Sequence, residues 1–203
     1  MELSGRVDPA GKSDLVGRVD PTPTDPAGQA EQANGQAGSP MGRELRPGRG
    51  RYFEDWQTGD HYLTAGRTIT EADLSNFCGV SGDFNELHTN AEAMRDSQFG
   101  ERIAHGALVL AVVTGLRQQS GLFEGTIIAF AEIRSWRFLL PVLLGDTIHV
   151  RAEVVELRET SKPDRGIMVQ RVAALNQRGE EVQAGEMVTL IKRRLEPETH
   201  PQG

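Results

Sequence analysis

Two side chains that could work as an acid–base pair lie close together in the sequence. Residues 81–88 read SGDFNELH, so Asp83 precedes His88 by five positions in a loop that opens with Gly82. A loop that turns can aim a carboxylate and an imidazole at one point, where they could hold a water molecule and move its protons. Surrounding groups can tune both side chains for proton transfer near neutral pH. On spacing alone, the simpler interpretation is that Asp83 caps a turn and His88 packs.

A second motif offers a site for a carbonyl oxygen. Residues 100–106 read GERIAHG and lead into residues 106–116, where Thr114 is the only polar side chain. Such a segment is expected to form a helix that is buried on all sides. Gly106 would lie at its start, where backbone N–H groups are unpaired and the helix dipole is positive. Because glycine lets a ligand approach closely, this N–H could bind an oxygen that becomes an enolate. The alternative for His105 and Gly106 is an ordinary helix start.

The chain after the apolar helix alternates between apolar and polar residues, as half-buried strands do. The alternation slips by one residue after Val154, as a β-bulge would cause, and a bulge bends a sheet. Wrapping a curved antiparallel sheet around the apolar helix is the economical way to bury that helix, so we expect an α+β fold. The expected strands are 127–138, 148–157, 167–175 and 187–193, with a turn at 176–179 and two short helices at 71–77 and 91–95.

Composition divides the chain into three parts. Residues 1–50 hold 9 of the 23 glycines and 6 of the 10 prolines, and every Phe, Tyr and Trp lies at Tyr52 or later. A stretch without aromatic residues buries too little apolar surface to offset its chain entropy. We therefore expect residues 1–50 to be a disordered leader and linker, 51–195 a single domain, and 196–203 a flexible tail.

Charge and composition exclude several classes of protein. The formal net charge of −7 argues against a nucleic-acid protein that works by neutralising phosphates. Cys78 is the only cysteine, which leaves neither an intramolecular disulfide nor a cysteine-rich metal site. No apolar run reaches the roughly 18 residues needed to span a bilayer, and the N-terminus lacks an apolar signal core. The expected location is the cytoplasm.

Several motifs, in the right order, resemble those of the MaoC-like dehydratases, the (R)-specific enoyl-CoA hydratase family. SGDFNELH at 81–88, followed by NAEA at 90–93, is similar to the hydratase motif of that family. IAHG at 103–106 is similar to its approach to the central helix, and WRFLLPVLLGDT at 136–147 to its later strands. The resemblance covers about residues 51–194. It implies the hot-dog fold, in which an antiparallel sheet wraps around a long helix.

The resemblance implies an enzyme, a hydro-lyase that reversibly adds water syn to trans-2-enoyl thioesters and gives (3R)-3-hydroxyacyl thioesters. It assigns catalysis to Asp83 and His88, binding of the thioester oxygen to the N–H of Gly106, and orientation of the loop or substrate to Asn85. The substrate would be a thioester of coenzyme A or of an acyl carrier protein. Neither a metal nor another cofactor is implied, because conjugation already makes C3 electrophilic. The family usually has proline at the position of Glu86, so a freer loop with an added charge is expected here.

A homodimer, or a larger assembly of dimers, is also expected. The resemblance implies it, and the sheet offers a surface for it. Trp136 and Phe138 are expected on the face of the sheet that points away from the helix, where a second subunit could cover them.

Two other functions remain open at this point. The first is a hot-dog thioesterase, which would use a carboxylate near the central helix, and residues 107–115 contain none. The second is a non-catalytic subunit that binds acyl-CoA, against which the presence of both Asp83 and His88 argues.

Overall fold

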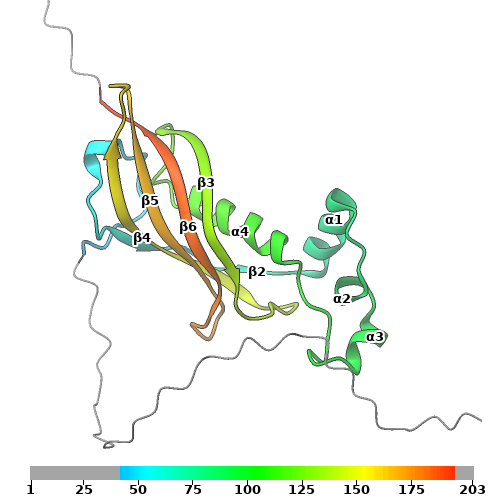
Figure 1. The fold of residues 1–203 in the computed structure, drawn as a ribbon. Coiled ribbons are helices and arrows are strands. Elements are labelled where there is room, and N and C mark those ends of the chain that lie inside the picture. The colour runs from blue at the N-terminus through cyan, green and yellow to red at the C-terminus, as the bar shows by residue number, and fades with distance from the viewer. Residues whose placement is uncertain (1–41, 195–203) are drawn as a thin grey trace, which may run out of the picture. The chain divides into compact units, whose positions relative to one another are not determined.

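The structure, a computed structural model, describes residues 42–194. Its strands form a curved antiparallel sheet, and one long helix, α4, lies against one face of the sheet (Figure 1). The prediction of an α+β fold is confirmed. The hydrogen-bonded strand order is β1-β4-β5-β6-β3, with β2 paired to β4. The elements are η1 (Phe53–Asp55), β1 (His61–Leu63), β2 (Arg67–Thr68), α1 (Glu71–Ser81), α2 (Glu86–Thr89), α3 (Ala91–Arg95), α4 (Gly106–Gln119), β3 (Ile127–Phe138), β4 (Thr147–Glu159), β5 (Arg165–Leu175) and β6 (Glu181–Lys192).

The curvature of the sheet comes from bulges. The register between β4 and β5 shifts between Val154 and Glu156, so the slip predicted after Val154 is confirmed. The predicted start of β6 is wrong, because β6 begins at Glu181 rather than at 187. Gly185 interrupts the alternation there, yet the backbone pairs with β5 on both sides of it.

The apolar helix is not buried on all sides, so that expectation is wrong for this chain by itself. Buried residues of α4 pack against the sheet, and Val109 and Val113 are fully buried. The opposite side of the helix carries small and polar residues that are exposed, namely Ala107, Ala111, Thr114, Gly115 and Gln118. None of the helices of residues 42–194 is long and apolar enough to cross a membrane.

A buried arginine near the C-terminal end of α4 makes hydrogen bonds to side chains of the sheet. Arg117 is 6% exposed and donates hydrogen bonds to Gln170 Oε1 at 2.6 Å, Met187 Sδ at 3.1 Å and Tyr62 Oη at 3.4 Å. Its guanidinium also lies over the Phe123 ring, 5.1 Å from the centroid. All three acceptors are uncharged, and within residues 42–194 the Arg117 guanidinium has no carboxylate partner. Neutral acceptors and an aromatic face therefore satisfy the buried cation.

The segment 42–50, which composition assigns to the linker, packs against the domain instead. Leu45 is 5% exposed and belongs to the core, and its N–H donates to the carbonyl of His61 at 2.7 Å. Arg43 pairs with Asp60, whose side chain is 1% exposed, at 2.6 Å. Composition could not reveal this packing, because a single leucine and a single arginine, each with a specific partner, are enough to attach the segment to the domain. The rest of the leader expected at 1–50, namely residues 1–41, and the tail expected at 196–203 lie outside the described residues.

Two deletions should separate the linker from the domain. Removal of residues 1–41 is expected to leave the melting temperature and activity unchanged. Removal of residues 1–50 also takes away Arg43 and Leu45, and it leaves the Asp60 carboxylate buried without its partner. Gln57 N–H still donates to Asp60, so most of the loss comes from the buried Leu45 side chain and should be about 2–3 kcal/mol, or a melting temperature lower by roughly 4–12 °C. Thermal unfolding monitored by circular dichroism measures both, and equal melting temperatures would contradict this assignment.

Candidate active site

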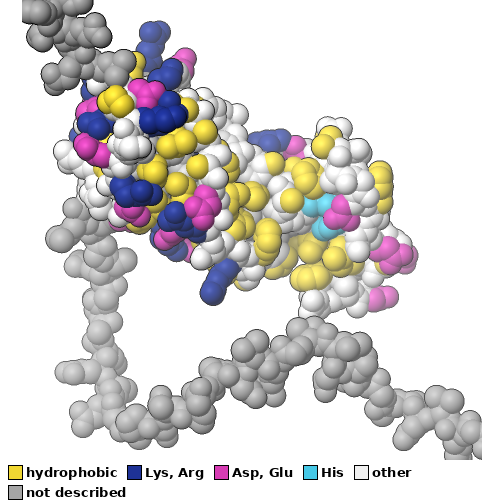
Figure 2. Space-filling view, turned by 45° about the horizontal axis from the view of Figure 1, so that its top comes forward, with side chains coloured by type: hydrophobic (Ala, Val, Ile, Leu, Met, Phe, Trp, Pro, Cys, Tyr) yellow, Lys and Arg dark blue, Asp and Glu magenta, His cyan; other side chains and the backbone are white. Residues whose placement is uncertain are grey.

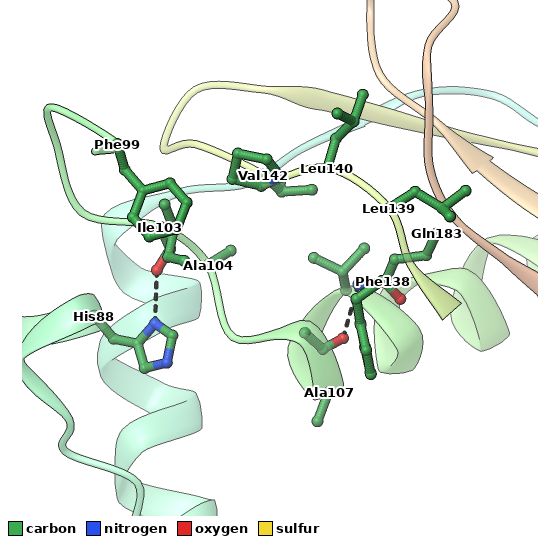
Figure 3. A pocket seen from close by; sticks show the side chains of 13 residues that line it. His88, Phe99, Ile103, Ala104, Ala107, Phe138, Leu139, Leu140, Val142 and Gln183 are labelled. Atoms are coloured by element: carbon green, nitrogen blue, oxygen red, sulfur yellow. Dashed lines mark hydrogen bonds between the residues drawn. The ribbon is translucent and has the colours of Figure 1, made fainter. Parts of the chain in front are cut away.

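His88 is held in one orientation at the end of α2. It is 8% exposed, and its Nδ1 lies 2.7 Å from the backbone carbonyl of Ile103. Because a carbonyl oxygen only accepts hydrogen bonds, Nδ1 carries the hydrogen and Nε2 keeps its lone pair in the neutral ring. Nε2 is therefore the nitrogen that can accept a proton, and Figure 3 shows the hydrogen bond of the His88 ring at one side of the cavity.

Asp83 lies opposite this nitrogen. Gly82 ends α1 in the left-handed conformation, with φ of 75°, and this turn brings Asp83 toward α2. The Oδ2 atom of Asp83 is 3.9 Å from Nε2 of His88, which is longer than a hydrogen bond. The Asp83 side chain is 52% exposed, whereas that of His88 is 9% exposed. The structure thus brings the two residues together, at a distance at which both atoms can contact the same water molecule.

Asn85 and Glu86 start the short helix that carries His88. Asn85 is the N-cap residue of α2, and its Oδ1 accepts the N–H of Leu87 at 3.0 Å. Glu86 is the first helical residue. Proline is favoured at that position because its missing N–H would have no helical partner, and an acidic residue is favoured there by the helix dipole. The helical turn therefore constrains the backbone at Glu86, where a freer loop is expected from the sequence.

Gly106 begins α4 at the wall of a cavity of about 480 Å³. Its N–H has no hydrogen-bond partner within residues 42–194, and the side chain of His105, the N-cap residue, does not cap the helix. A Cβ atom at Gly106 would lie 2.6 Å from the ring of Phe138, so a larger residue fits here only if that ring moves. Apart from His88 and Gln183, the cavity is lined by Gly106 and apolar side chains, contributed by Phe99, Ile103, Ala104, Ala107, Val109, Phe138, Leu139, Leu140, Pro141 and Val142 (Figure 3).

The expected orientation of two aromatic residues of β3 is wrong. Phe138 packs against Gly106, and Trp136 packs partly buried against the core, so both lie on the helix side of the sheet. The indole Nε1 of Trp136 donates to Gln183 Oε1 at 3.0 Å, and Gln183 Nε2 donates to the carbonyl of Gly106 at 3.0 Å. The pairing of β3 with β6 shifts register between Arg134 and Arg137, and an irregularity of this kind changes the face of the sheet toward which the following side chains point. Gln183 carries no sequence signal of this contact.

An ion pair near the His88 loop connects the segment before α4 with helix α1. Arg102 donates to Glu71 through two hydrogen bonds of 2.9 and 2.6 Å, and so joins the segment before α4 to α1. These hydrogen bonds hold the pKa of the Glu71 carboxyl below its usual range and raise the pKa of Arg102. A second cavity of about 200 Å³ lies beside this pair, and His88 and Cys78 also line it.

Asp83, His88 and His105 are the one group of possible metal ligands in the described part of the chain, with ligand atoms within 4.8 Å of one another. The rings of His88 and His105 are stacked, with centroids 3.6 Å apart and an angle of 27° between planes. Lone pairs of ring nitrogens lie in the ring plane, so two stacked rings cannot direct them at one tetrahedral ion. The arrangement suits proton transfer better than metal binding.

An antiparallel sheet around a central helix, with a carboxylate and an imidazole beside a cavity at the start of that helix, defines a protein of the hot-dog class. The family described as MaoC like domain matches residues 55–174, which is more than half of the sequence. The chain therefore belongs to the MaoC-like dehydratase family, and the resemblance found in the sequence is confirmed.

Individual relatives agree with this assignment. Protein MaoC of Klebsiella aerogenes is 43% identical over 101 residues, which are 50% of this chain but only 30% of that protein. The (R)-specific enoyl-CoA hydratase of Rhodospirillum rubrum is 33% identical over 106 residues, covering 52% of this chain and 71% of that enzyme. A double-hotdog protein of Mycobacterium tuberculosis superposes with a TM-score of 0.64 at 23% identity, covering 75% of this chain and 46% of that one. The predicted hot-dog fold is thereby confirmed.

Proposed function

We propose that this chain is a hydro-lyase that adds water reversibly and syn to trans-2-enoyl thioesters and gives (3R)-3-hydroxyacyl thioesters. The observation that carries the proposal is the 3.9 Å separation of Asp83 Oδ2 and His88 Nε2 beside the cavity at the start of α4. Similarity to an enzyme named (R)-specific enoyl-CoA hydratase supports it. Another relative is named a 3-hydroxyacyl-[acyl-carrier-protein] dehydratase, so we propose a thioester of coenzyme A or of a carrier protein as substrate.

The proposed mechanism uses the hydrogen-bond pattern of His88. Its Nε2 has a lone pair because Nδ1–H is engaged by Ile103, so Nε2 takes a proton from water as the oxygen bonds to C3. The electron pair of the double bond moves to the thioester oxygen, and the N–H of Gly106 stabilises this enolate. The imidazolium of His88 passes its proton to the carboxylate of Asp83, 3.9 Å from Nε2, and the carboxyl so formed gives that proton to C2. Both groups act from one face, which gives syn addition.

The apolar cavity fits the acyl part of such a substrate. A thioester oxygen at Gly106 would place the double bond near His88, because both residues line the same cavity. The remaining walls offer aromatic and aliphatic side chains, which favour an acyl chain over a charged group. We propose no metal and no other cofactor, and the predicted cytoplasmic location stays a prediction.

We propose that two copies of the chain associate through α4 and β3. The exposed side of α4 carries small residues, and apolar side chains along β3 are 36–64% exposed, among them Ile128, Phe130 and Ile133. Hydrophobic side chains also surround the histidines on the face shown in Figure 2. A second copy would remove this apolar surface from water. Multi-angle light scattering at micromolar concentration should give twice the mass of 22.2 kDa or a multiple of it, and a monomer would contradict the proposal.

Product analysis tests the proposed reaction against its alternatives. With crotonyl-CoA, we expect loss of the enoyl absorbance, formation of the (3R)-3-hydroxy product and no release of thiol. Release of free thiol would indicate a thioesterase, although α4 contributes no carboxylate to the cavity. Binding of acyl-CoA without turnover at any chain length would indicate a non-catalytic subunit.

A further inference from the structure

His105, directly before α4, touches both members of the acid–base pair from a buried position. The residue is 3% exposed, and its ring stacks on that of His88 with centroids 3.6 Å apart. Its Nε2 lies 3.0 Å from the backbone carbonyl of Asp83 and 3.7 Å from Sγ of Cys78. On the other side the ring meets Phe77, at 5.0 Å between centroids. One side chain therefore contacts α1, the loop of Asp83 and α2.

The hydrogen-bond partners of His105 define its tautomer. The carbonyl of Asp83 can only accept, so Nε2 carries the hydrogen and donates it. Nδ1 is buried and has no partner in the part of the chain that the structure describes. A second proton on Nδ1 would therefore have no acceptor and would place a charge against the stacked ring of His88. His105 serves as a neutral donor to the Asp83 backbone.

The backbone of His105 adds a third connection. The N–H of Gly106, which we propose as the donor to the thioester oxygen, belongs to the peptide bond between His105 and Gly106. The side chain of the same residue reaches Asp83 and His88. The three groups proposed for the chemistry are thus joined through one residue, whose ring lines neither of the two cavities described above.

We infer that His105 is a positioning residue, which fixes the distance of Asp83 and His88 from each other and from Gly106. The inference rests on the proposed function. Asp83 needs such support because its side chain is half exposed and follows a left-handed glycine. Helix capping does not explain His105, since its side chain makes no capping hydrogen bond to α4. A displacement of about 1 Å at reacting groups can lower a rate by roughly 10²-fold.

Substitutions can separate the hydrogen bond from the stacking. His105→Phe keeps a ring against His88 but removes the donor, and we expect kcat for crotonyl-CoA hydration to fall roughly 30-fold with KM within about threefold. His105→Gln keeps an N–H that can reach the Asp83 carbonyl, and it should recover most of that loss. His149→Phe is the matched control, because His149 lies on β4 and its ring contacts the carbonyl of Thr64. It should keep wild-type kcat.

A double-mutant cycle shows whether His105 acts through Asp83. In the Asp83→Asn background, His105→Phe should lower kcat by less than about threefold, because the group that it positions has already lost its function. A loss caused by poorer folding would persist in full in that background. Circular dichroism of each variant checks the fold. If the Phe variant does not fold, His105→Gln is compared with His105→Asn, whose amide is one methylene too short, and the Asn variant should be at least tenfold slower.

Two results would overturn the inference. One is wild-type kcat in a folded His105→Phe variant, and the other is an undiminished effect of that substitution in the Asp83→Asn background. Equal kcat for the Gln and Asn variants would overturn it in the same way. Failure of the proposed function looks different, because Asp83→Asn would then keep its turnover or the wild-type protein would hydrate no enoyl thioester.

Discussion

Asp83→Asn is expected to lower kcat for the hydration of crotonyl-CoA by roughly 10²–10⁴-fold, with little change in KM. Asparagine has nearly the shape of aspartate, and its amide oxygen can still accept the N–H of Asn85, as Oδ1 of Asp83 does at 3.2 Å. What it lacks is a carboxyl proton to give to C2. The loop should therefore keep its conformation while the protonation step fails. Stopped-flow or steady-state loss of the enoyl absorbance measures the effect.

A matched carboxylate serves as the control for this prediction. Glu92 on α3 is exposed and pairs with Arg95 at 2.7 Å, away from the cavity at Gly106. Glu92→Gln removes one negative charge from the same region and should leave kcat unchanged. The double variant Asp83→Asn, His88→Gln should be scarcely slower than either single variant, because the two groups act as a unit. Near-wild-type kcat in a folded Asp83→Asn variant would refute the proposed mechanism.

The sequence predicted those features of the site that are determined by residues close together in the chain. The loop that opens at Gly82 and the start of α4 at Gly106 follow from residue types within a few positions, whereas the helical turn that begins after Asn85 was not predicted, because a freer loop was expected there. The sequence also indicates the bulge after Val154, because the alternation changes phase where the register shifts. These features are encoded by neighbours along the chain.

The contacts that tie the site together join residues far apart in the sequence. His105 reaches Asp83 across 22 positions, and Gln183 reaches Gly106 across 77. No periodicity or propensity distinguishes a histidine that stacks on another from one that begins a helix. The packing of Leu45 was missed for the same reason, since a lone leucine in a linker-like stretch has no local signature. Long-range partners become visible only when the fold places them.

Gly106→Ala is expected to lower kcat/KM by roughly 10²–10³-fold while the protein stays folded. The new methyl group would meet Cε1 of Phe138 at 2.6 Å. Phe138 is 64% exposed, so its ring can move, and it would move at the mouth of the cavity where the thioester oxygen must approach the N–H. The backbone itself tolerates alanine, because Gly106 has no positive φ. The expected defect is thus one of access to the N–H and not of folding.

A substitution at Gly115, the other glycine of α4, distinguishes loss of access to the Gly106 N–H from an effect of helix propensity. A Cβ atom at Gly115 would have nothing within 4 Å in one copy of the chain, so Gly115→Ala should gain about 0.5–1 kcal/mol of unfolding free energy. It should keep full activity as long as light scattering gives the same mass as for the wild-type protein, because Gly115 lies on the side of α4 where we propose that a second copy binds. Adding Phe138→Ala to Gly106→Ala removes the crowding ring and should restore part of the lost kcat/KM. If the double variant regains nothing while Phe138→Ala alone is active, crowding is not the cause. Full activity of Gly106→Ala would show that the thioester oxygen binds elsewhere.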